Sequence, residues 1–162
     1  MKSESEASRA VELYADTVRR VCFLHLESHS DVEDVFQEVF LKYVLRTAPF
    51  DSAEHEKAWL IRVAVNACKD IHKSFFRRKV LFLKELDSEP SYSMPEDSSD
   101  VLDAVLALPE KYRDVIYLFY CEGYSAVEIA RLLGKSENTI YTWLSRAKVK
   151  LKDALGGDFA DE

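Results

Sequence analysis

Residues 125–151 read SAVEIARLLGKSENTIYTWLSRAKVKL, a stretch that predicts two short helices joined by a sharp turn. Ser125 and Glu128 have the spacing of a capping box, which would begin the first helix. Gly134 is expected to make the turn, because glycine adopts a positive φ at little cost. Ser136 is expected to cap the second helix. The residues predicted to face inward are Ile129, Ala130, Leu133, Ile140 and Leu144.

The second helix of this pair leaves polar and basic side chains on its exposed side. In helix-turn-helix motifs the start of the second helix meets base edges in the major groove of DNA, and nearby basic side chains contact phosphates. The alternative is an ordinary helical hairpin within a bundle. The residues predicted to contact duplex DNA are Ser136, Glu137, Asn138, Thr139, Tyr141, Thr142, Ser145, Arg146 and Lys148.

The composition of the whole chain is that of a helical globular protein. The chain has 162 residues, a net charge of -7, and only 4 Gly and 4 Pro, which favours helices over turn-rich sheets. Its 3 cysteines are widely spaced, which argues against a disulfide framework and favours a reducing cytoplasm. We expect a cytoplasmic protein without membrane insertion, because neither a signal peptide nor a membrane-spanning segment is evident.

Helical periodicity and a change in composition predict two domains. Apolar residues recur at helical spacing over 7–27, 31–46 and 56–78. A later segment rich in Ser, Asp, Glu and Pro cannot bury enough apolar surface to fold and predicts a linker. The expected fold is all-α, with two small helical domains joined by a flexible linker. The predicted division is a first domain over 1–86, a linker over 87–100, a second domain over 101–155 and a frayed tail over 156–162.

Charge is strongly segregated along the chain. Residues 62–84 carry seven basic side chains and one acidic side chain, whereas residues 85–114 carry nine acidic and two basic ones. Blocks of opposite charge indicate different partners for different segments. The simpler alternative is a set of solvated helix faces.

Three stretches resemble one known family. Residues 108–151, beginning LPEKYRDVIYLFY, are similar to region 4 of bacterial sigma factors. Residues 31–46, DVEDVFQEVFLKYVLR, resemble region 2.2, and residues 57–78, KAWLIRVAVNACKDIHKSFFRR, resemble regions 2.3 and 2.4. Only the predicted linker separates the two parts. This layout resembles the extracytoplasmic-function group, the small two-domain sigma factors.

The resemblance implies a transcription initiation factor and not an enzyme. Such a protein joins core RNA polymerase through the β′ clamp helices and the β subunit, directs it to a subset of promoters and helps to melt promoter DNA. The resemblance implies no cofactor and no small-molecule substrate, and it leaves room for an anti-sigma factor as a further partner. One alternative is a helix-turn-helix regulator that binds duplex DNA, as a dimer, without joining the polymerase. Another is a nucleic-acid-processing enzyme, which would need a nucleophile or clustered metal-binding acids.

The resemblance also assigns residues to two surfaces in the first domain. Phe50 lies in a stretch that resembles the family loop receiving a flipped base, although Phe50 is equally compatible with a place in the core. Trp59 matches a family tryptophan, and its spacing favours core packing. The residues assigned to core polymerase are Asp34, Gln37, Glu38 and Lys42. The residues assigned to the minus-ten element and its melting are Arg62, Asn66, Lys69, Asp70, Lys73, Arg77 and Arg78.

Two further features are the departure from the family pattern at residues 141–143 and a possible metal-binding spacing. Tyr141, Thr142 and Trp143 stand where many members of that family have Lys-Ser-Arg, so the resemblance does not fix the minus-thirty-five preference. The exchange of two basic residues for aromatic ones either weakens phosphate contacts or shifts readout toward thymine methyl groups. A further alternative for Trp143 is packing against its own domain. Cys22, His25 and His29 loosely resemble a zinc spacing, but no fourth ligand is evident, and we expect no metal site.

Overall fold

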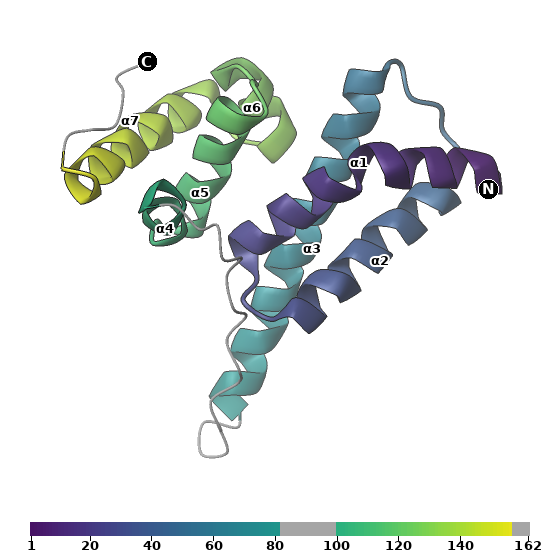
Figure 1. The fold of residues 1–162 in the computed structure, drawn as a ribbon, viewed down its shortest axis with the longest axis horizontal. Coiled ribbons are helices and arrows are strands. Elements are labelled where there is room, and N and C mark those ends of the chain that lie inside the picture. The colour runs from purple at the N-terminus through teal and green to yellow at the C-terminus, as the bar shows by residue number, and fades with distance from the viewer. Residues whose placement is uncertain (82–99, 157–162) are drawn as a thin grey trace. The chain divides into compact units, whose positions relative to one another are not determined.

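The first 81 residues form three long helices, in a computed structural model that describes residues 1–81 and 100–156 and the side chains of residues 1–73 and 100–156. The helices are α1 (Glu4–His25), α2 (His29–Leu45) and α3 (Ala53–Leu81). Each of them packs against the other two (Figure 1). Ser3 begins α1 with a capping box, and the side chain of Ser28 caps α2.

The first core is built from the apolar stripes of these helices. In α2 the stripe repeats at helical spacing, and Val32, Val35 and Val39 are fully buried. Tyr43 and Leu60 are among the largest buried side chains. The remaining buried apolar residues include Val18, Val21, Cys22, Ile61, Ala64 and Cys68.

The second part of the chain consists of α4 (Asp100–Leu106), α5 (Glu110–Ile116), the π-helix η1 (Tyr117–Cys121), α6 (Ala126–Leu133) and α7 (Glu137–Ala154). Within the described residues both parts are helical and contain no strand. Helices α4, α5 and α6 all pack against α7. The sequence predicted a single helix after Pro109, but its last turn is widened, because the N–H of Glu122 donates to the carbonyl of Tyr117 at 3.2 Å.

The chain divides into two compact units, Met1–Tyr92 and Ser93–Glu162. Most of the predicted linker, residues 87–99, lies outside the described residues. Asp100, its last residue, already belongs to α4. Most of the predicted tail also lies outside them, and only Gly156 is described. No helix in the described ranges is long and apolar enough to cross a membrane.

The three residues with a zinc-like spacing, Cys22, His25 and His29, lie in different environments. Cys22 is fully buried in the first core and His25 is also buried, whereas His29 is exposed at the start of α2. The three side chains therefore do not share one accessible face.

Candidate nucleic-acid interface

Helices α6 and α7 form the turn that the sequence predicts. Ser125 accepts a hydrogen bond from the N–H of Glu128 at 3.2 Å, and Glu128 accepts one from the N–H of Ser125 at 3.0 Å. These hydrogen bonds hold the pKa of the Glu128 carboxyl below its ordinary value. Gly134 has φ 68°, and the N–H of Lys135 reaches back to the carbonyl of Ala130 at 2.9 Å. Leu132 is buried where the sequence predicted Leu133, which is only half-buried.

The start of α7 presents most of the side chains predicted to contact duplex DNA. Ser136 caps the helix, accepting a hydrogen bond from the N–H of Thr139 at 3.2 Å, so both residues also maintain the helix start. Thr139 and Lys148 are half-buried. The exposed members of the predicted set are Ser136, Glu137, Asn138, Tyr141, Thr142, Ser145 and Arg146.

The two aromatic residues of α7 have different environments. Tyr141 is 54% exposed on the same side as Asn138 and Ser145. Trp143 is half-buried, and the ammonium of Lys111, at the start of α5, lies 5.4 Å from the centre of its ring. Trp143 therefore packs against its own unit, one of the two alternatives that the sequence left open. Across α7, the ammonium of Lys148 lies 5.5 Å from the ring of Phe119.

The residues predicted to contact the minus-ten element follow one side of α3. Arg62, Asn66 and Lys73 recur at three- to four-residue multiples and are all exposed. Asp70 is exposed beside them, and Lys69 is half-buried. The side chains of Arg77 and Arg78 lie outside the described residues. The described members thus form a polar, mostly basic strip about three helical turns long.

An aromatic cluster lies at the beginning of the same helix. The ring of Phe50 stacks on the ring of Tyr43, with centres 6.0 Å apart, and meets the edge of Trp59 at 5.7 Å. Both Phe50 and Trp59 are half-buried, so neither is a full core residue. Trp59 precedes Asn66 by seven residues, which places the cluster on the polar side of α3 at its N-terminal end.

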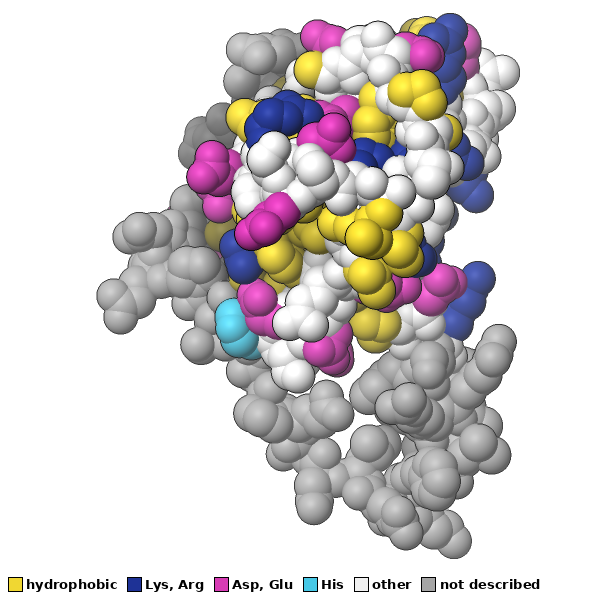
Figure 2. Space-filling model, turned by 90° about the vertical axis from the view of Figure 1, so that its right-hand side faces the viewer, with side chains coloured by type: hydrophobic (Ala, Val, Ile, Leu, Met, Phe, Trp, Pro, Cys, Tyr) yellow, Lys and Arg dark blue, Asp and Glu magenta, His cyan; other side chains and the backbone are white. Residues whose placement is uncertain are grey.

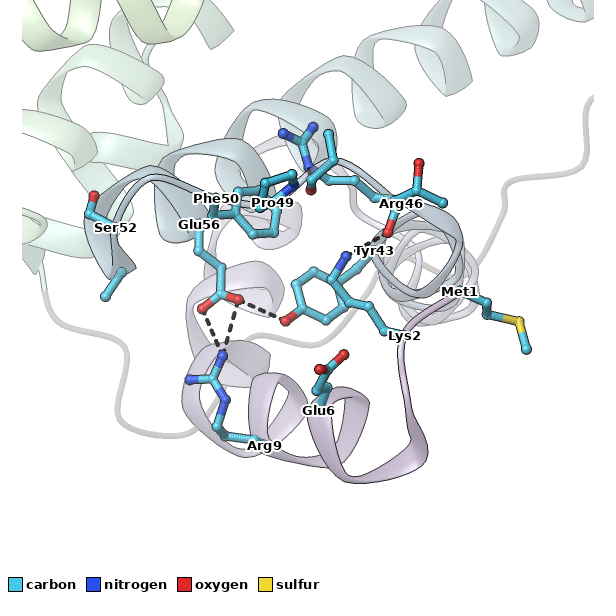
Figure 3. Close-up of a pocket in the computed structure, with 13 residues that line it drawn as sticks. Met1, Lys2, Glu6, Arg9, Tyr43, Arg46, Pro49, Phe50, Ser52 and Glu56 are labelled. Carbon is cyan, nitrogen blue, oxygen red and sulfur yellow. Dashed lines mark hydrogen bonds and ion pairs between the residues drawn. The ribbon is translucent and has the colours of Figure 1, made fainter.

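A buried acid ties this cluster to α1. Glu56 is only 5% exposed; it accepts a hydrogen bond from the hydroxyl of Tyr43 at 2.7 Å and contacts the Arg9 guanidinium at 3.2 Å (Figure 3). Burial alone would raise the pKa of the Glu56 carboxyl, but the hydroxyls of Tyr43 and Tyr14, with Arg9, outweigh burial and lower it. Burial and the neighbouring carboxylate raise the pKa of Tyr43 to about 12. The acid is therefore ionised and the phenol neutral at pH 7.

The exposed side of α2 combines charge with apolar side chains. Asp34, Gln37 and Glu38 are exposed on one face, and Lys42 pairs with Glu38 at 3.1 Å. Leu41 and Leu45 share this face and are 59% and 57% exposed. Figure 2 shows hydrophobic side chains lying among charged ones on the side it views. Such a mixture is typical of a protein-binding surface with an apolar centre and a polar rim.

Sequence reasoning missed the two leucines of α2 and the residues around the aromatic cluster. Leu41 and Leu45 were detectable, because they fall off the buried stripe of their helix. Arg9 and Glu56 lie 47 residues apart, and Lys2 and Arg46 lie 44 apart. No local pattern connects residues at such separations.

Comparison with known families identifies the chain. Residues 10–79 match the family described as sigma-70 region 2, and residues 98–151 match sigma-70, region 4. The chain is 31% identical to the ECF RNA polymerase sigma factor SigL of Mycobacterium tuberculosis, over 78% of this chain and 75% of SigL. It belongs to the extracytoplasmic-function group of the sigma-70 family. This membership places it among sigma factors and not among the regulators that act without the polymerase.

Two further likenesses agree with the membership. The ECF RNA polymerase sigma factor BldN of Streptomyces coelicolor is 32% identical over 93% of this chain, which spans 60% of the length of BldN. The sigma factor RpoE of Bartonella quintana, solved in complex with the anti-sigma factor NepR, has the same fold with a TM-score of 0.70. That likeness covers 94% of this chain and 98% of RpoE at 22% identity.

Proposed function

We propose that this sigma factor joins core RNA polymerase in the cytoplasm, directs it to a subset of promoters and helps to melt promoter DNA. The polymerase supplies the chemistry of RNA synthesis, and the sigma factor supplies recognition. One observation carries the proposal: both sigma-70 regions are present in order, and the region 2 part has an exposed α2 face that its own core does not use. A regulator that only binds duplex DNA has no need for this face.

We assign the α2 face to the polymerase. Its acids would approach basic side chains of the β′ clamp helices and set the rate and register of association. The exposed leucines would supply the apolar contacts on which much of the affinity of such interfaces depends. The proposed contact residues are Asp34, Gln37, Glu38, Leu41, Lys42 and Leu45.

We assign two surfaces to promoter DNA. The basic strip on α3 would track the phosphates of the melted minus-ten strand, with the aromatic cluster beside it to receive an unstacked base. The N-terminal part of α7 would enter the major groove at the minus-thirty-five element, with Asn138, Tyr141 and Thr142 at base edges and Arg146 at the backbone.

We also expect an anti-sigma factor as a partner of this chain. RpoE of Bartonella quintana was solved with one, NepR. A protein that covers the α2 face or the α7 face would prevent assembly of the holoenzyme or its binding to promoters.

Binding to core RNA polymerase tests the proposal. We expect the purified chain to bind the core tightly, and the double variant Asp34→Lys, Glu38→Lys to bind roughly tenfold more weakly, because attraction at the rim becomes repulsion. Asp34→Lys alone retains the Glu38–Lys42 ion pair. It therefore separates the effect of reversing a surface charge from the effect of losing that pair. Glu12→Lys, at an exposed position on α1, has the same charge change as Asp34→Lys alone and is the matched control for that single variant.

Each result has a distinct meaning. A folded wild-type chain that does not bind the core would refute the proposed function. Tight binding that survives both reversals would keep the function and refute our assignment of the α2 face. The resulting holoenzyme can then be used to select promoters from genomic fragments.

A further inference from the structure

Tyr141 is a large aromatic side chain of α7 that the core of the second unit does not use. It is 54% exposed in the second turn of the helix. Among the described residues its side chain makes no hydrogen bond, ion pair or ring contact. A single exposed ring is common on protein surfaces, so the meaning of this one depends on the side chains around it.

Three other side chains predicted to contact duplex DNA are engaged within the second unit. The hydroxyl oxygens of Ser136 and Thr139 share a hydrogen bond at 2.8 Å at the start of α7. The ammonium of Lys148 lies 5.5 Å from the ring centre of Phe119 and 5.8 Å from that of Tyr120. These contacts leave Tyr141 and its exposed neighbours as the side chains most available to base edges.

Trp143, the other aromatic residue of α7, does not share the exposed side of Tyr141. Positions two residues apart on a helix are separated by about 200° around its axis. Trp143 accordingly turns into its own unit, where it is half-buried and lies 5.4 Å from the ammonium of Lys111. Of the two aromatic side chains of α7, only Tyr141 is therefore available to DNA.

The exposed side of α7 around Tyr141 is polar but carries no positive charge. Asn138 precedes Tyr141 by three residues and Ser145 follows it by four, and both are exposed on the same side. Residues 137–145 contain no lysine or arginine, and the first basic residue of α7 is Arg146. A bidentate contact of arginine or lysine with guanine is the commonest specific contact in the major groove. Before Arg146, α7 itself cannot read guanine in this way.

The ring of Tyr141 suits an apolar feature of the major groove. Long side chains on a helix point back toward its N-terminus, so this ring extends toward the end of α7 that we assign to the groove. The apolar group that base edges present in the major groove is the C5 methyl group of thymine, which apolar side chains contact. Contact between the ring and the methyl group removes apolar surface of both from water.

We propose that Tyr141 is a specificity-determining residue whose ring packs against the C5 methyl group of one thymine in the minus-thirty-five element. This inference rests on the proposed function and deepens it, because it names the base that one side chain selects. The contact favours an A·T pair at that place, since the other bases lack the methyl group. The promoter subset of this sigma factor is thereby defined in part by an apolar contact.

Removing single methyl groups tests the contact in the holoenzyme. The probes are duplexes of a promoter selected as described above, each with deoxyuridine in place of one thymine of the minus-thirty-five element on either strand. Deoxyuridine lacks the C5 methyl group and keeps the base-pairing groups. For the wild type we expect one position at which this exchange weakens binding about fourfold, the effect of one buried methyl group. Tyr141→Ala should weaken binding of the unmodified duplex, and the exchange at that position should then have little further effect.

Matched variants separate the ring from its surroundings. Tyr141→Phe keeps the ring and should keep the sensitivity to deoxyuridine at the same thymine. Asn138→Ala, on the same side of α7, should weaken binding of every duplex and keep that sensitivity. Asp153→Asn changes an exposed residue in the last turn of α7 and should leave the sensitivity of the wild type unchanged.

Three outcomes would overturn this role of Tyr141 in distinguishable ways. If the holoenzyme binds its promoters and no thymine position responds to deoxyuridine, Tyr141 reads no methyl group. If one position responds equally in the wild type and in Tyr141→Ala, another side chain makes the contact. If the holoenzyme selects no promoter at all, the proposed function fails and the role of Tyr141 fails with it.

Discussion

At the scale of single residues, Glu56 shows how a buried charge is retained in this fold. Its carboxylate is removed from water, which costs free energy, but it receives the Tyr43 hydroxyl and the Arg9 guanidinium. The contacts join α1, α2 and α3 beside the aromatic cluster. Glu56 therefore acts as a structural residue that positions the loop carrying Phe50.

We predict that Glu56→Gln lowers the free energy of unfolding at pH 7 by about 2 kcal/mol, because hydrogen bonds to a buried charge are lost. The pKa of Glu56 is lowered in the folded state, so its contribution is complete above the ordinary value of 4.5 and is lost as the pH falls through the lowered pKa. The difference between wild type and variant in urea unfolding should therefore shrink below about pH 4.5. Glu54→Gln is the control, because Glu54 is exposed in the first turn of the same helix. It should change the free energy of unfolding by less than about 0.5 kcal/mol at either pH. A difference that persists unchanged at low pH would contradict this account.

Of the two aromatic residues of α7, we predict that Tyr141 contributes mainly to DNA binding and Trp143 mainly to stability. Tyr141→Ala should leave stability within about 0.5 kcal/mol of the wild type and weaken binding to a minus-thirty-five duplex, because the side chain is exposed. Trp143→Ala should lower the free energy of unfolding by about 2 kcal/mol, because the indole is half-buried beneath Lys111. Urea unfolding and duplex titration measure the two effects. Equal loss of stability in both variants would show that the two environments are not distinct.

At the scale of elements, the turn between α6 and α7 depends on the backbone of one residue. Gly134 has φ 68°, and a Cβ added there would meet no atom within 4 Å. The requirement for glycine is therefore conformational and not steric. The angle between the two helices, and with it the presentation of α7, follows from this turn.

We predict that Gly134→Ala lowers the stability of the second unit by about 1–2 kcal/mol, the cost of placing an alanine in the left-handed region. Gly134→Asn should cost less, because asparagine tolerates this region better than alanine. Urea unfolding followed by the fluorescence of Trp143 measures both variants. An asparagine variant that is no more stable than the alanine variant would indicate that something other than φ makes glycine necessary.

At the scale of the whole molecule, two units each have a core of their own and each contains one tryptophan. Trp59 belongs to the first unit and Trp143 to the second, and the chain has 2 tryptophans in total. Variants with Trp59→Phe or Trp143→Phe therefore report on one unit at a time.

We predict separate responses of the two units to local damage. Glu56→Gln should move the unfolding transition seen through Trp59 and leave the one seen through Trp143 in place. Gly134→Ala should do the reverse, since each substitution changes contacts within its own unit and sites without shared partners contribute additively to stability. Transitions that shift together in both backgrounds would mean that the units unfold as one.

The sequence by itself determined most of the helices, the caps at Ser125 and Ser136, the turn at Gly134 and the polar faces of α2, α3 and α7, because these follow from local spacing and from the chemistry of neighbouring residues. It did not predict the caps at Ser3 and Ser28 or the widened turn of η1. It placed Ile129 and Ala130 correctly in the second core and mistook Leu133 for Leu132, since adjacent positions differ by only 100° around a helix. Tertiary structure alone decided which helix sides meet. Periodicity identifies a buried stripe of a helix but not the helix against which that stripe packs. Only the packed helices therefore show the contact of Trp143 with Lys111, the contacts of Glu56 with Arg9 and Tyr43, and the hydrogen bond from Lys2 to Arg46.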